Sequence, residues 1–356
     1  MSTTKKQTHY PAIDSVRGLS ALAVLIAHTN PHWLPHAEIL MDIFFTISAF
    51  LITATIIENI KKNGNISLLT FTKRRLLRLY PALIFCVTTY VTIAYFIVED
   101  FKFIINDAFF TLIYLSNLNK LTDYIYPDFF THTWSLSIEE QFYLIWPSLL
   151  TILLINKSIW EYKISILILI LFTSITWRFH LVNDGAELSR LYYGSDTRID
   201  AFIAGGLLAF MQERLNILYK NKYHFKVILA FLVILLAIAL YYWNPKVVTY
   251  FKWQQPIILF LSCALIFITT RNDNNIFEKI FSPKIFQWLG VRCYGIYLWH
   301  WPLIWLFAFT TEIYKPLLLL IVLPFSLFMA WFSYKYIEEP ILRRRPKMPN
   351  SYQKRR

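Results

Sequence analysis

Apolar runs long enough to cross a lipid bilayer recur along the whole chain, and no other feature restricts its fold as much. A transmembrane helix needs about 20 mostly apolar residues, and its backbone N–H and C=O groups must be bonded within the protein. Apolar residues make up 56% of the 356 positions, and charged residues only 16%. The sequence therefore predicts an all-α fold, a polytopic membrane helix bundle of about ten transmembrane helices with no separate soluble domain.

Lysine and arginine in the loops predict the topology, because short cytoplasmic loops are enriched in both. The loop 58–78 and the tail 341–356 are strongly basic, so we expect both in the cytoplasm together with the segment 1–12. The membrane domain then comprises 13–340. Its predicted spans are about 13–30, 39–57, 79–98, 134–154, 164–181, 199–211, 227–243, 256–270, 288–309 and 317–337.

Two features do not fit a simple alternation of helices and loops. The segment 103–118 is apolar but short, and a full crossing there would reverse every later helix. It is therefore predicted to be re-entrant or interfacial. Arg178, Arg190 and Arg198 fall on the predicted outer side, against the usual enrichment of basic residues inside.

The remaining composition narrows the function. The net charge of +13 comes from short loops and the tail, which indicates orientation and contact with anionic lipid rather than nucleic acid. The three cysteines, Cys86, Cys263 and Cys293, are far apart and match neither a disulfide framework nor a metal site. No Gly-rich phosphate loop, His/Cys cluster or G-x-S-x-G elbow is present, which argues against a metal enzyme or a serine hydrolase.

The first apolar run carries three ionisable residues on one stripe. Arg17 and His28 are eleven positions apart, about three helical turns or roughly 16 Å, and Asp14 lies one turn before Arg17. Ionisable groups at membrane depth tend to face a protein interior and to mark function. His28 is the leading catalytic candidate, because imidazole can take a proton from a hydroxyl near neutral pH. The alternative is an interfacial ion pair with His28 in the far headgroup layer.

A cluster of arginines precedes the third span. Arg74, Arg75 and Arg78 lie at the predicted cytoplasmic mouth of a helix, with Arg74 and Arg78 one turn apart. The guanidinium fork suits phosphate or pyrophosphate, so these residues are candidates for binding an anionic cofactor. Contact with lipid headgroups explains them equally well.

Three further polar clusters lie at helix ends. Ser135 and Glu139 share a face, and capping chemistry explains one glutamate there but not the whole cluster with His132 and Glu140. Arg198 and Asp200 precede the Gly205–Gly206 pair; they are either a structural ion-pair set or contacts to a polar acceptor. His300 lies between two tryptophans, where an aromatic belt is the default and a site the alternative. Ser48 and Ala49 suggest a seam of close helix contact.

These motifs together resemble the membrane acyltransferase family 3, bacterial O-acetyltransferases that modify surface polysaccharides. The matching segments are spread along the chain in order: Asp14-x-x-Arg17-Gly18, the Arg17/His28 pair, FFTISAFLIT, RRLLRLYP, WSLSIEEQFYLIWP, DTRIDA with the Gly pair, YGIYLWHWP and YIEEPILRR. The resemblance implies about ten membrane helices with both ends in the cytoplasm, in agreement with the loop charges. This sequence differs from the family pattern at Ala49, where the family usually has Gly.

The resemblance also implies roles for particular residues. Arg17 and His28 match an essential pair of the family, and Glu139 matches the carboxylate of its S-x-x-x-E motif. The arginines 74, 75 and 78 match a basic motif proposed to meet the acyl donor. Some members continue into an extracytoplasmic domain; because this sequence stops at Arg356, the protein is expected to act alone or with a partner.

The expected function is an O-acyltransferase of the bacterial inner membrane. We expect it to move an acetyl group from cytoplasmic acetyl-CoA to a sugar hydroxyl of a glycan or lipid-linked glycan, with lipopolysaccharide O-antigen as the favoured acceptor. Asp14, Ser135, Arg198, Asp200 and His300 are expected to contact substrate, and no metal is expected. The alternatives are a transporter or flippase, against which the lack of an inverted repeat weighs, and a non-catalytic scaffold.

Overall fold

The computed structural model describes residues 10–64, 66–98, 101–122, 129–155, 162–218, 222–270, 281, 283–310 and 315–344. All regular elements in these ranges are helical. The long helices are α1 (Pro11–Thr29), α2 (Leu40–Asn63), α3 (Leu68–Ile97), α6 (Trp134–Ile155), α8 (Lys163–Asn183), α10 (Ile199–Leu218), α11 (Lys222–Tyr242), α12 (Gln255–Thr269), α15 (Cys293–Thr310) and α16 (Lys315–Ser333).

Shorter helices lie between the long ones. They are η1 (Ala37–Ile39), α4 (Phe101–Leu112), α5 (Ser116–Asn119), η2 (Thr131–Thr133), α9 (Leu188–Tyr193), η3 (Tyr250–Gln254), α14 (Lys284–Val291), η4 (Tyr334–Glu338) and α17 (Glu339–Arg343). Most of the predicted segment 1–12 and most of the tail 341–356 lie outside the described residues.

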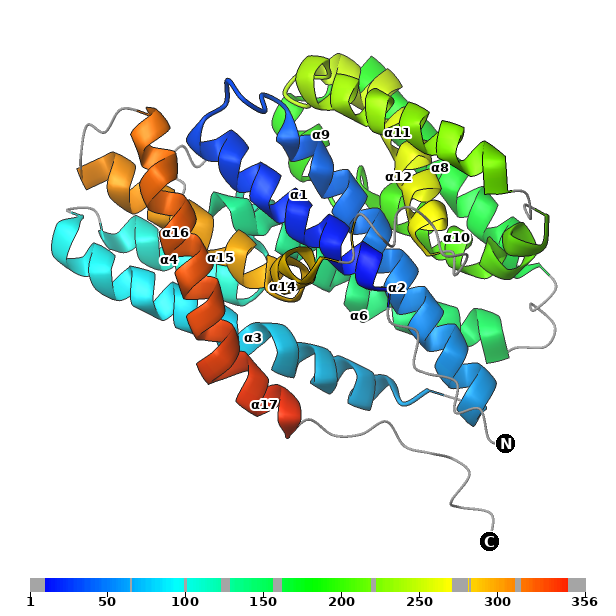
Figure 1. Ribbon diagram of the computed structural model, residues 1–356, viewed down its shortest axis with the longest axis horizontal. Helices are drawn as coiled ribbons and strands as arrows, with labels where there is room; N and C mark the ends of the chain where they lie inside the picture. Colours follow the sequence, from blue (N-terminus) through cyan, green and yellow to red (C-terminus); the bar gives the residue numbers. More distant parts are fainter. Residues whose placement is uncertain are drawn as a thin grey trace, which may run out of the picture.

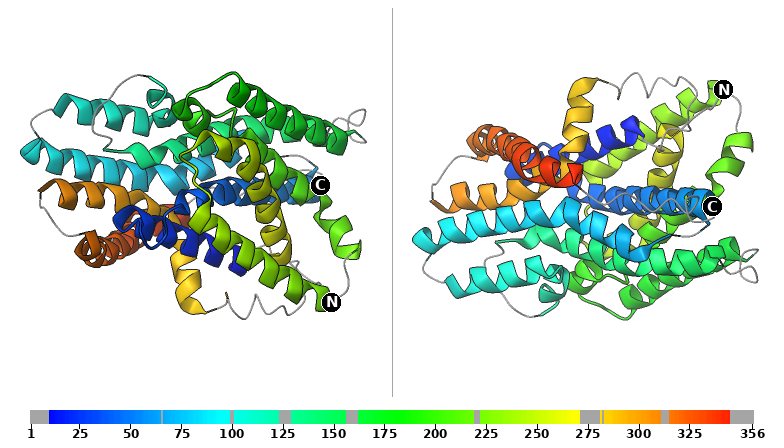
Figure 2. Two further views of the ribbon diagram at one scale, coloured as in Figure 1. Left: turned by 90° about the horizontal axis from the view of Figure 1, so that it is seen from above. Right: turned by 90° about the horizontal axis from the view of Figure 1, so that it is seen from below.

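The long helices run roughly along one direction and pack side by side, as Figures 1 and 2 show from three sides. Seven helical segments of the described chain are long and apolar enough to cross a membrane. Large apolar side chains such as Leu144, Phe172, Phe260 and Leu320 are exposed around the bundle, as expected for a surface that faces lipid. The predicted all-α, polytopic membrane fold is confirmed; the predicted count of about ten spans exceeds these seven.

The short helix α4 ends part-way along the bundle. Its 12 residues extend about 18 Å, too short for the hydrocarbon core. It packs against α3, where the Tyr80 hydroxyl donates to the Leu112 carbonyl at 3.0 Å. The chain then breaks at Tyr114, whose φ of 56° is left-handed, and Gln141 Nε2 donates to its carbonyl at 3.1 Å. That 103–118 is re-entrant or interfacial stays a prediction.

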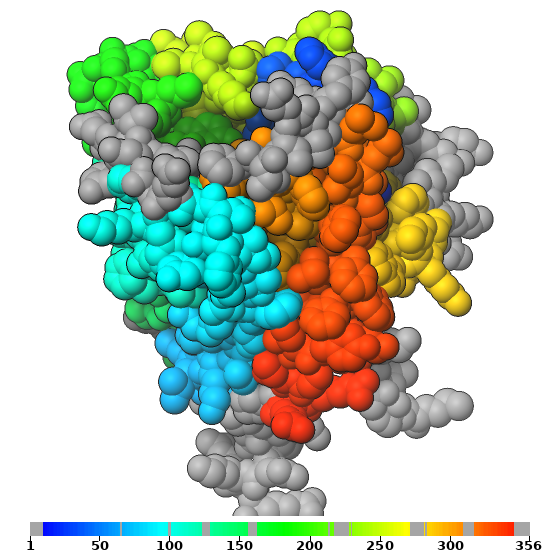
Figure 3. Space-filling view, turned by 90° about the vertical axis from the view of Figure 1, so that its left-hand side faces the viewer, coloured from blue at the N-terminus to red at the C-terminus, as the bar shows by residue number. Residues whose placement is uncertain are grey.

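The predicted single span 288–309 is wrong, because two helices occupy it. α14 ends at Arg292, where φ is −106° and ψ is 7°, and α15 begins at the next residue. Figure 1 shows α14 almost end-on while α15 lies in the plane, and Figure 3 shows α14 projecting beside α16. The physical reason is a backbone crossing with α1: a Cβ on Gly18 would lie 2.5 Å from the Gly290 nitrogen.

The predicted seam of small residues joins α2 to α10. A Cβ on Gly205 would collide with the Thr46 carbonyl oxygen, so only glycine allows this approach. Gly206 faces the ring of Trp146, whose Nε1 donates to Thr53 Oγ1 at 2.8 Å. Ala49 of the same α2 face is fully buried. This tight pairing holds α2, which contributes Met41 and Ser48 to the site described next.

Candidate functional site

Two cavities open inside the bundle and share two residues. We call the first the arginine cavity, about 40 Å³, and its lining includes Arg17, Ser135, Glu139 and Cys293. We call the second the histidine cavity, about 410 Å³, and its lining includes His28, Glu38, His132, Trp134, Tyr192, Tyr193, Lys246 and Trp301. Met41 and Tyr297 line both cavities. The two candidates of α1, Arg17 and His28, therefore line different cavities that have Met41 and Tyr297 in common.

Arg17 supplies an unused donor to the arginine cavity. Its Nε atom is buried and has no hydrogen-bond partner among the described residues. Leaving a buried polar group unpaired costs about 1–3 kcal/mol, so such a group commonly awaits a ligand. Asp14, one turn earlier, lies within electrostatic range and has contacts of its own.

Glu139 and Ser135 lie on the α6 side of the same cavity. Glu139 accepts hydrogen bonds from Ser48 Oγ of α2 and from the Tyr143 hydroxyl, the latter at 2.9 Å. Ser135 Oγ lies 2.7 Å from the Tyr297 hydroxyl. The i, i+4 spacing that suggested a shared face thus brings both side chains to the cavity that Arg17 lines.

The three arginines of α3 have different surroundings. Arg75 Nε donates to Glu140 at 3.1 Å, and its guanidinium covers the Tyr143 ring. Arg74 is half-buried and has contacts of its own. Arg78 is exposed and within electrostatic range of Arg17 and Asp14. Arg78 is therefore the member of this set whose charge adds to that of Arg17.

A pair of histidines forms the deepest part of the histidine cavity. His28 Nδ1 lies 3.0 Å from His300 Nε2, and His300 Nδ1 lies 2.5 Å from the Tyr297 carbonyl oxygen. His300 is fully buried, whereas His28 is half-buried and borders the open volume. The Trp301 ring meets His28 edge-on with centroids 5.0 Å apart. The sequence singled out both histidines, but only the fold brings α1 and α15 together here.

A third histidine, His132, belongs to this cluster, although it was not among the predicted site residues. Its Nε2 lies 3.1 Å from the Leu298 carbonyl oxygen, and its buried Nδ1 has no partner among the described residues. Proline lacks an N–H, so Pro302 leaves this carbonyl, four residues earlier, without its helical donor. The sequence signal that could have indicated this contact is Pro302 inside an apolar helix, because a proline frees the carbonyl four residues earlier.

Tyr297 connects the two cavities. Its hydroxyl donates to the His132 carbonyl at 2.5 Å and lies next to Ser135, while its own carbonyl meets His300. Tyr297 therefore contacts both the α6 wall of the arginine cavity and His300, the buried histidine next to the histidine cavity. Sequence reasoning missed this role, because a tyrosine among interfacial aromatic residues is unremarkable.

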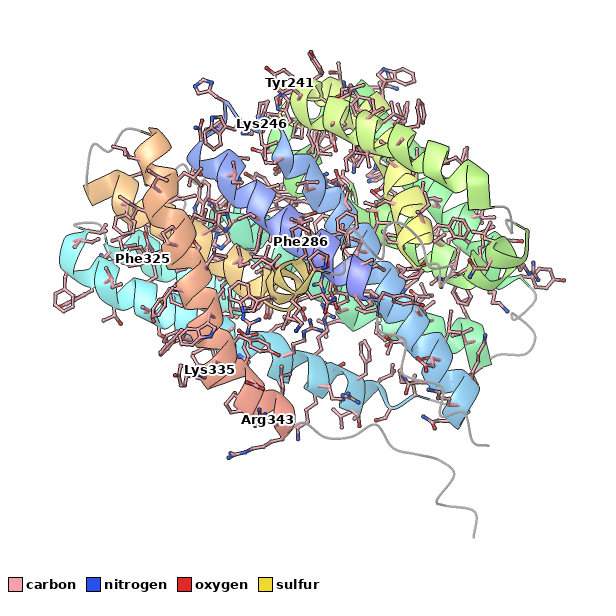
Figure 4. The ribbon with its side chains drawn as sticks, viewed as in Figure 1. Tyr241, Lys246, Phe286, Phe325, Lys335 and Arg343 are labelled. Carbon is pink, nitrogen blue, oxygen red and sulfur yellow. The ribbon has the colours of Figure 1, made fainter. Side chains whose placement is uncertain are left out.

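The histidine cavity opens at one end of the bundle. Lys246 Nζ forms a 2.8 Å ion pair with Glu38 Oε1, and Figure 4 shows Lys246 at the end opposite Arg343 of α17. The walls carry the aromatic side chains of Trp134, Tyr192, Tyr193 and Trp301. A chamber of this size with flat aromatic walls and a few polar groups suits a polar organic ligand.

Arg198 and Asp200 lie in buried ion pairs and line neither of the two cavities. Arg198 donates to Asp42 at 2.7 Å, and the Tyr250 hydroxyl donates to the other Asp42 oxygen at 2.8 Å. Asp200 accepts from Arg178. These contacts favour the structural ion-pair alternative over substrate binding. They also give partners to Arg178 and Arg198, two of the three arginines on the predicted outer side.

The third such arginine, Arg190, lies in the loop outside the spans. It pairs with Asp196 at 2.6 Å, and Trp177 Nε1 also donates to that carboxylate at 2.7 Å. Burial acts to raise the pKa of Asp196, but these hydrogen bonds outweigh it and hold the pKa below its usual value. All three arginines are thus neutralised by partners within the protein.

Comparison with known proteins shows to which family the chain belongs. A family model described as an acyltransferase domain matches residues 10–335. The chain belongs to this acyltransferase family. The resemblance read from the ordered motifs is thereby confirmed. No solved structure shows a significant similarity to the chain.

Relatives of the family member described here carry informative names. The chain is 31% identical to peptidoglycan O-acetyltransferase OatA of Listeria monocytogenes, over 96% of this chain and 57% of the relative. It is 29% identical to O-acetyltransferase OatA of Staphylococcus aureus, over 94% of this chain and 57% of the relative. The chain thus spans just over half the length of these relatives.

Proposed function

We propose that this member of the acyltransferase family is a membrane-embedded O-acetyltransferase that uses the two cavities for its two substrates. The acyl donor enters the arginine cavity, and a glycan hydroxyl enters the histidine cavity. The observation that carries the proposal is that both cavities are lined by Met41 and Tyr297, with the unpaired Nε of Arg17 in one cavity and His28 in the other. Group transfer between two substrates requires such a meeting point.

Acetyl-CoA is the proposed donor. Its phosphates carry charges that suit Arg78, which lies at the predicted cytoplasmic mouth of α3 and within electrostatic range of Arg17. The unused Nε–H of Arg17 suits the thioester carbonyl oxygen, which gains negative charge as the hydroxyl attacks. The chain's positive-inside pattern supports entry of the donor from the cytoplasm and both termini on that side.

His28 is the proposed general base. It takes the proton of the acceptor hydroxyl while the oxygen attacks the thioester carbonyl carbon, and the C–S bond of the tetrahedral adduct then breaks. The proton passes to the leaving thiolate, so the products are the sugar ester and free CoA. General-base assistance of this kind contributes about 10²–10⁴ in rate. An acetyl group carried briefly on His28 would give the same products in two steps.

The proposed acceptor is a hydroxyl of an exported glycan at the outer face of the bacterial cytoplasmic membrane. The aromatic walls and the Glu38–Lys246 pair of the histidine cavity support a polar saccharide ligand. The names of the relatives favour peptidoglycan over the O-antigen expected from the motifs. An O-antigen sugar is therefore the second candidate within the same acceptor class.

The test uses the purified full chain in lipid nanodiscs with radiolabelled acetyl-CoA. An N-acetylglucosamine oligosaccharide and an O-antigen oligosaccharide serve as acceptors in separate assays. We expect labelled ester on one acceptor, loss of that product in His28→Ala, and unchanged activity in His180→Gln, an exposed histidine of α8. Full activity of a normally inserted His28→Ala variant would overturn the assignment. Transport of the oligosaccharide without consumption of acetyl-CoA would support the transporter alternative.

A further inference from the structure

We propose that His300 is a positioning residue that holds His28 in the tautomer with its proton on Nδ1 and its lone pair on Nε2. The effect on rate rests on the proposed function, whereas the tautomer itself does not. The proposal follows from a chain of three groups, the Tyr297 carbonyl, His300 and His28. The Tyr297 carbonyl can only accept a hydrogen bond, and this determines which atom donates in each of the following contacts.

The Tyr297 carbonyl is that starting point. A carbonyl oxygen only accepts, so the 2.5 Å contact requires the His300 Nδ1 atom to carry a proton. The opposite tautomer would place a nitrogen lone pair against an oxygen lone pair. His300 is fully buried, so no water replaces the lost bond, and that arrangement carries the cost of two unpaired groups.

The second group follows from the first. A neutral imidazole with its proton on Nδ1 has only a lone pair at Nε2. His300 Nε2 therefore accepts, and His28 Nδ1, 3.0 Å away, is the donor. In neutral His28 this leaves Nε2 unprotonated. The identity of the protonated nitrogen in a histidine is generally set by the bond that the other nitrogen makes.

The ring geometry supports a hydrogen bond rather than ring stacking. The His28 and His300 planes differ by 10°, and their centroids are 5.2 Å apart. That separation is close to the 3.0 Å contact plus the radii of two rings, so the rings meet edge to edge. The proton thus lies near the line between the two nitrogens, where a hydrogen bond is strongest.

The arrangement assigns the two nitrogens of His28 to different tasks. Nε2 is the atom able to take a proton from a ligand in the histidine cavity, which His28 lines. Once it has done so, the cationic ring keeps its Nδ1–H bond to His300, and that bond becomes charge-assisted. His300 thus acts through His28 as the carboxylate does in a Ser-His-Asp triad, with a neutral acceptor instead of an anion.

The neighbouring His132 does not provide this bond. Its Nε2 contacts the Leu298 carbonyl, and its ring is turned 80° from the His300 plane at a centroid distance of 5.3 Å. The positioning role therefore belongs to one of the two histidines that surround His28. This distinction makes a test by single substitution possible.

The test compares three substitutions of the full chain in lipid nanodiscs. In His300→Gln the side-chain amide reaches about as far as Nε2, and its oxygen can accept from His28. In His300→Asn the amide reaches only as far as Nδ1, so it can bond Tyr297 but not His28. His300→Phe keeps the ring volume without either nitrogen. His180→Gln controls for the loss of a histidine.

The first readout is the ¹⁵N NMR spectrum of histidine-labelled protein, with a His28→Gln sample to assign the His28 signals. It requires no activity. We expect the Nδ1–H tautomer at His28 in the wild-type protein and in His300→Gln, and an increased Nε2–H population in His300→Asn and His300→Phe. An unchanged His28 spectrum in His300→Phe would overturn the proposal.

The second readout is acetyl transfer from acetyl-CoA to the N-acetylglucosamine oligosaccharide. We expect His300→Phe and His300→Asn to lower kcat by about 10²-fold or more with KM unchanged, and His300→Gln to retain most of the wild-type kcat. Equal loss in all three variants would contradict the positioning role. If the wild-type protein transfers no acetyl group, the proposed function fails while the NMR result still decides the tautomer.

Discussion

At the scale of single residues, unused hydrogen-bonding capacity identifies the reactive parts of the molecule. The buried Nε of Arg17 and the buried Nδ1 of His132 lack partners in the described chain, and each belongs to a residue that lines one of the two cavities. The other buried charges near them are satisfied: Glu139 by Ser48 and Tyr143, for example. Buried polar groups are normally paired, so unpaired atoms of cavity-lining residues are candidate positions for a ligand; Glu38 Oε2 and Thr131 Oγ1 of the histidine cavity are two more such atoms.

Substitution of Arg17 tests its role at the thioester. If its Nε–H stabilises charge that develops on the carbonyl oxygen, Arg17→Ala lowers kcat by about 10²–10³-fold, as loss of one such donor does elsewhere. Arg78→Ala instead raises KM for acetyl-CoA, because its charge contributes to binding. Steady-state kinetics with varied acetyl-CoA separate the two effects. Arg343→Ala, an exposed arginine of α17, is the control. A raised KM without loss of kcat in Arg17→Ala would assign Arg17 to binding alone.

The buried pair of Asp42 and Arg198 tests the structural alternative for Arg198. Removing one partner of a buried ion pair leaves an uncompensated charge and costs about 3–5 kcal/mol, so Asp42→Asn should lower the unfolding temperature markedly. The double variant with Asp42→Asn and Arg198→Met should recover much of that loss. KM for the glycan should change in neither.

Thermal unfolding in detergent and initial-rate kinetics provide the two measurements for this pair. A rise in the glycan KM in Arg198→Met, with unfolding temperature preserved, would instead support the sequence-based prediction that Arg198 contacts substrate. The pair is suitable because both side chains are buried. Comparing the two single variants with the double variant in a double-mutant cycle separates the loss of a charge from the loss of a contact.

At the scale of elements, the crossing of α1 and α14 positions α1, which carries the proposed catalytic residues. Gly18 follows Arg17 directly, and its Cα faces the backbone of Leu289 and Gly290. α14 leads through Arg292 into α15, which carries Tyr297 and His300. One backbone contact thus fixes the relative position of the two helices that bring His28 and His300 together.

Gly18→Ala should disturb this crossing. The added Cβ would lie 2.7 Å from the Leu289 carbonyl carbon, and backbone cannot move aside as a side chain can, so we expect a loss of about 1–3 kcal/mol. Gly295→Ala is the matched comparison, since its Cβ would meet Ala330 at 3.1 Å. We expect a smaller loss there. Unfolding temperature and acetyl transfer measure both variants. An equal or smaller effect of Gly18→Ala would show that the crossing tolerates separation.

At the scale of the whole molecule, the two cavities meet at Met41 and Tyr297, and the proposed function assigns one to the donor and the other to the acceptor. The histidine cavity has Lys246 at its mouth, at the end of the bundle opposite α17. Arg78 of α3 lies within electrostatic range of Arg17, which lines the arginine cavity. A bundle of this kind allows chemistry across a membrane without movement of the whole glycan through it.

Cysteine labelling tests the orientation of the bundle. Lys246 and Arg343 are both exposed, so Lys246→Cys and Arg343→Cys should react with a membrane-impermeant maleimide from opposite sides. In intact cells stripped of outer layers we expect labelling of Lys246→Cys alone, and in inverted vesicles labelling of Arg343→Cys alone. The native cysteines 86 and 293 are buried and, together with the partly buried Cys263, are measured as background in the wild type. Labelling of both variants from one side would refute the topology.

The sequence by itself determined the class of the protein and several of the residues that line the two cavities. Apolar run length predicts a helix bundle because lipid offers the backbone no other partners, and the 3.6-residue period predicts that Arg17 and His28 face the interior together. The short run 103–118 predicts an incomplete crossing for the same geometric reason. These properties depend only on local spacing, which the chain specifies directly.

The tertiary structure alone decided which residues meet. The break at Arg292, the Gly18–Gly290 crossing and the edge-to-edge contact of His28 with His300 depend on helices that are about 270 residues apart in the chain, and no local period encodes such a pairing. The same holds for Arg198, whose charge suggested a ligand until the fold supplied Asp42 as its partner. Spacing places a side chain on a face, but only packing determines what that face touches, because burial in a low-dielectric interior rewards specific partners.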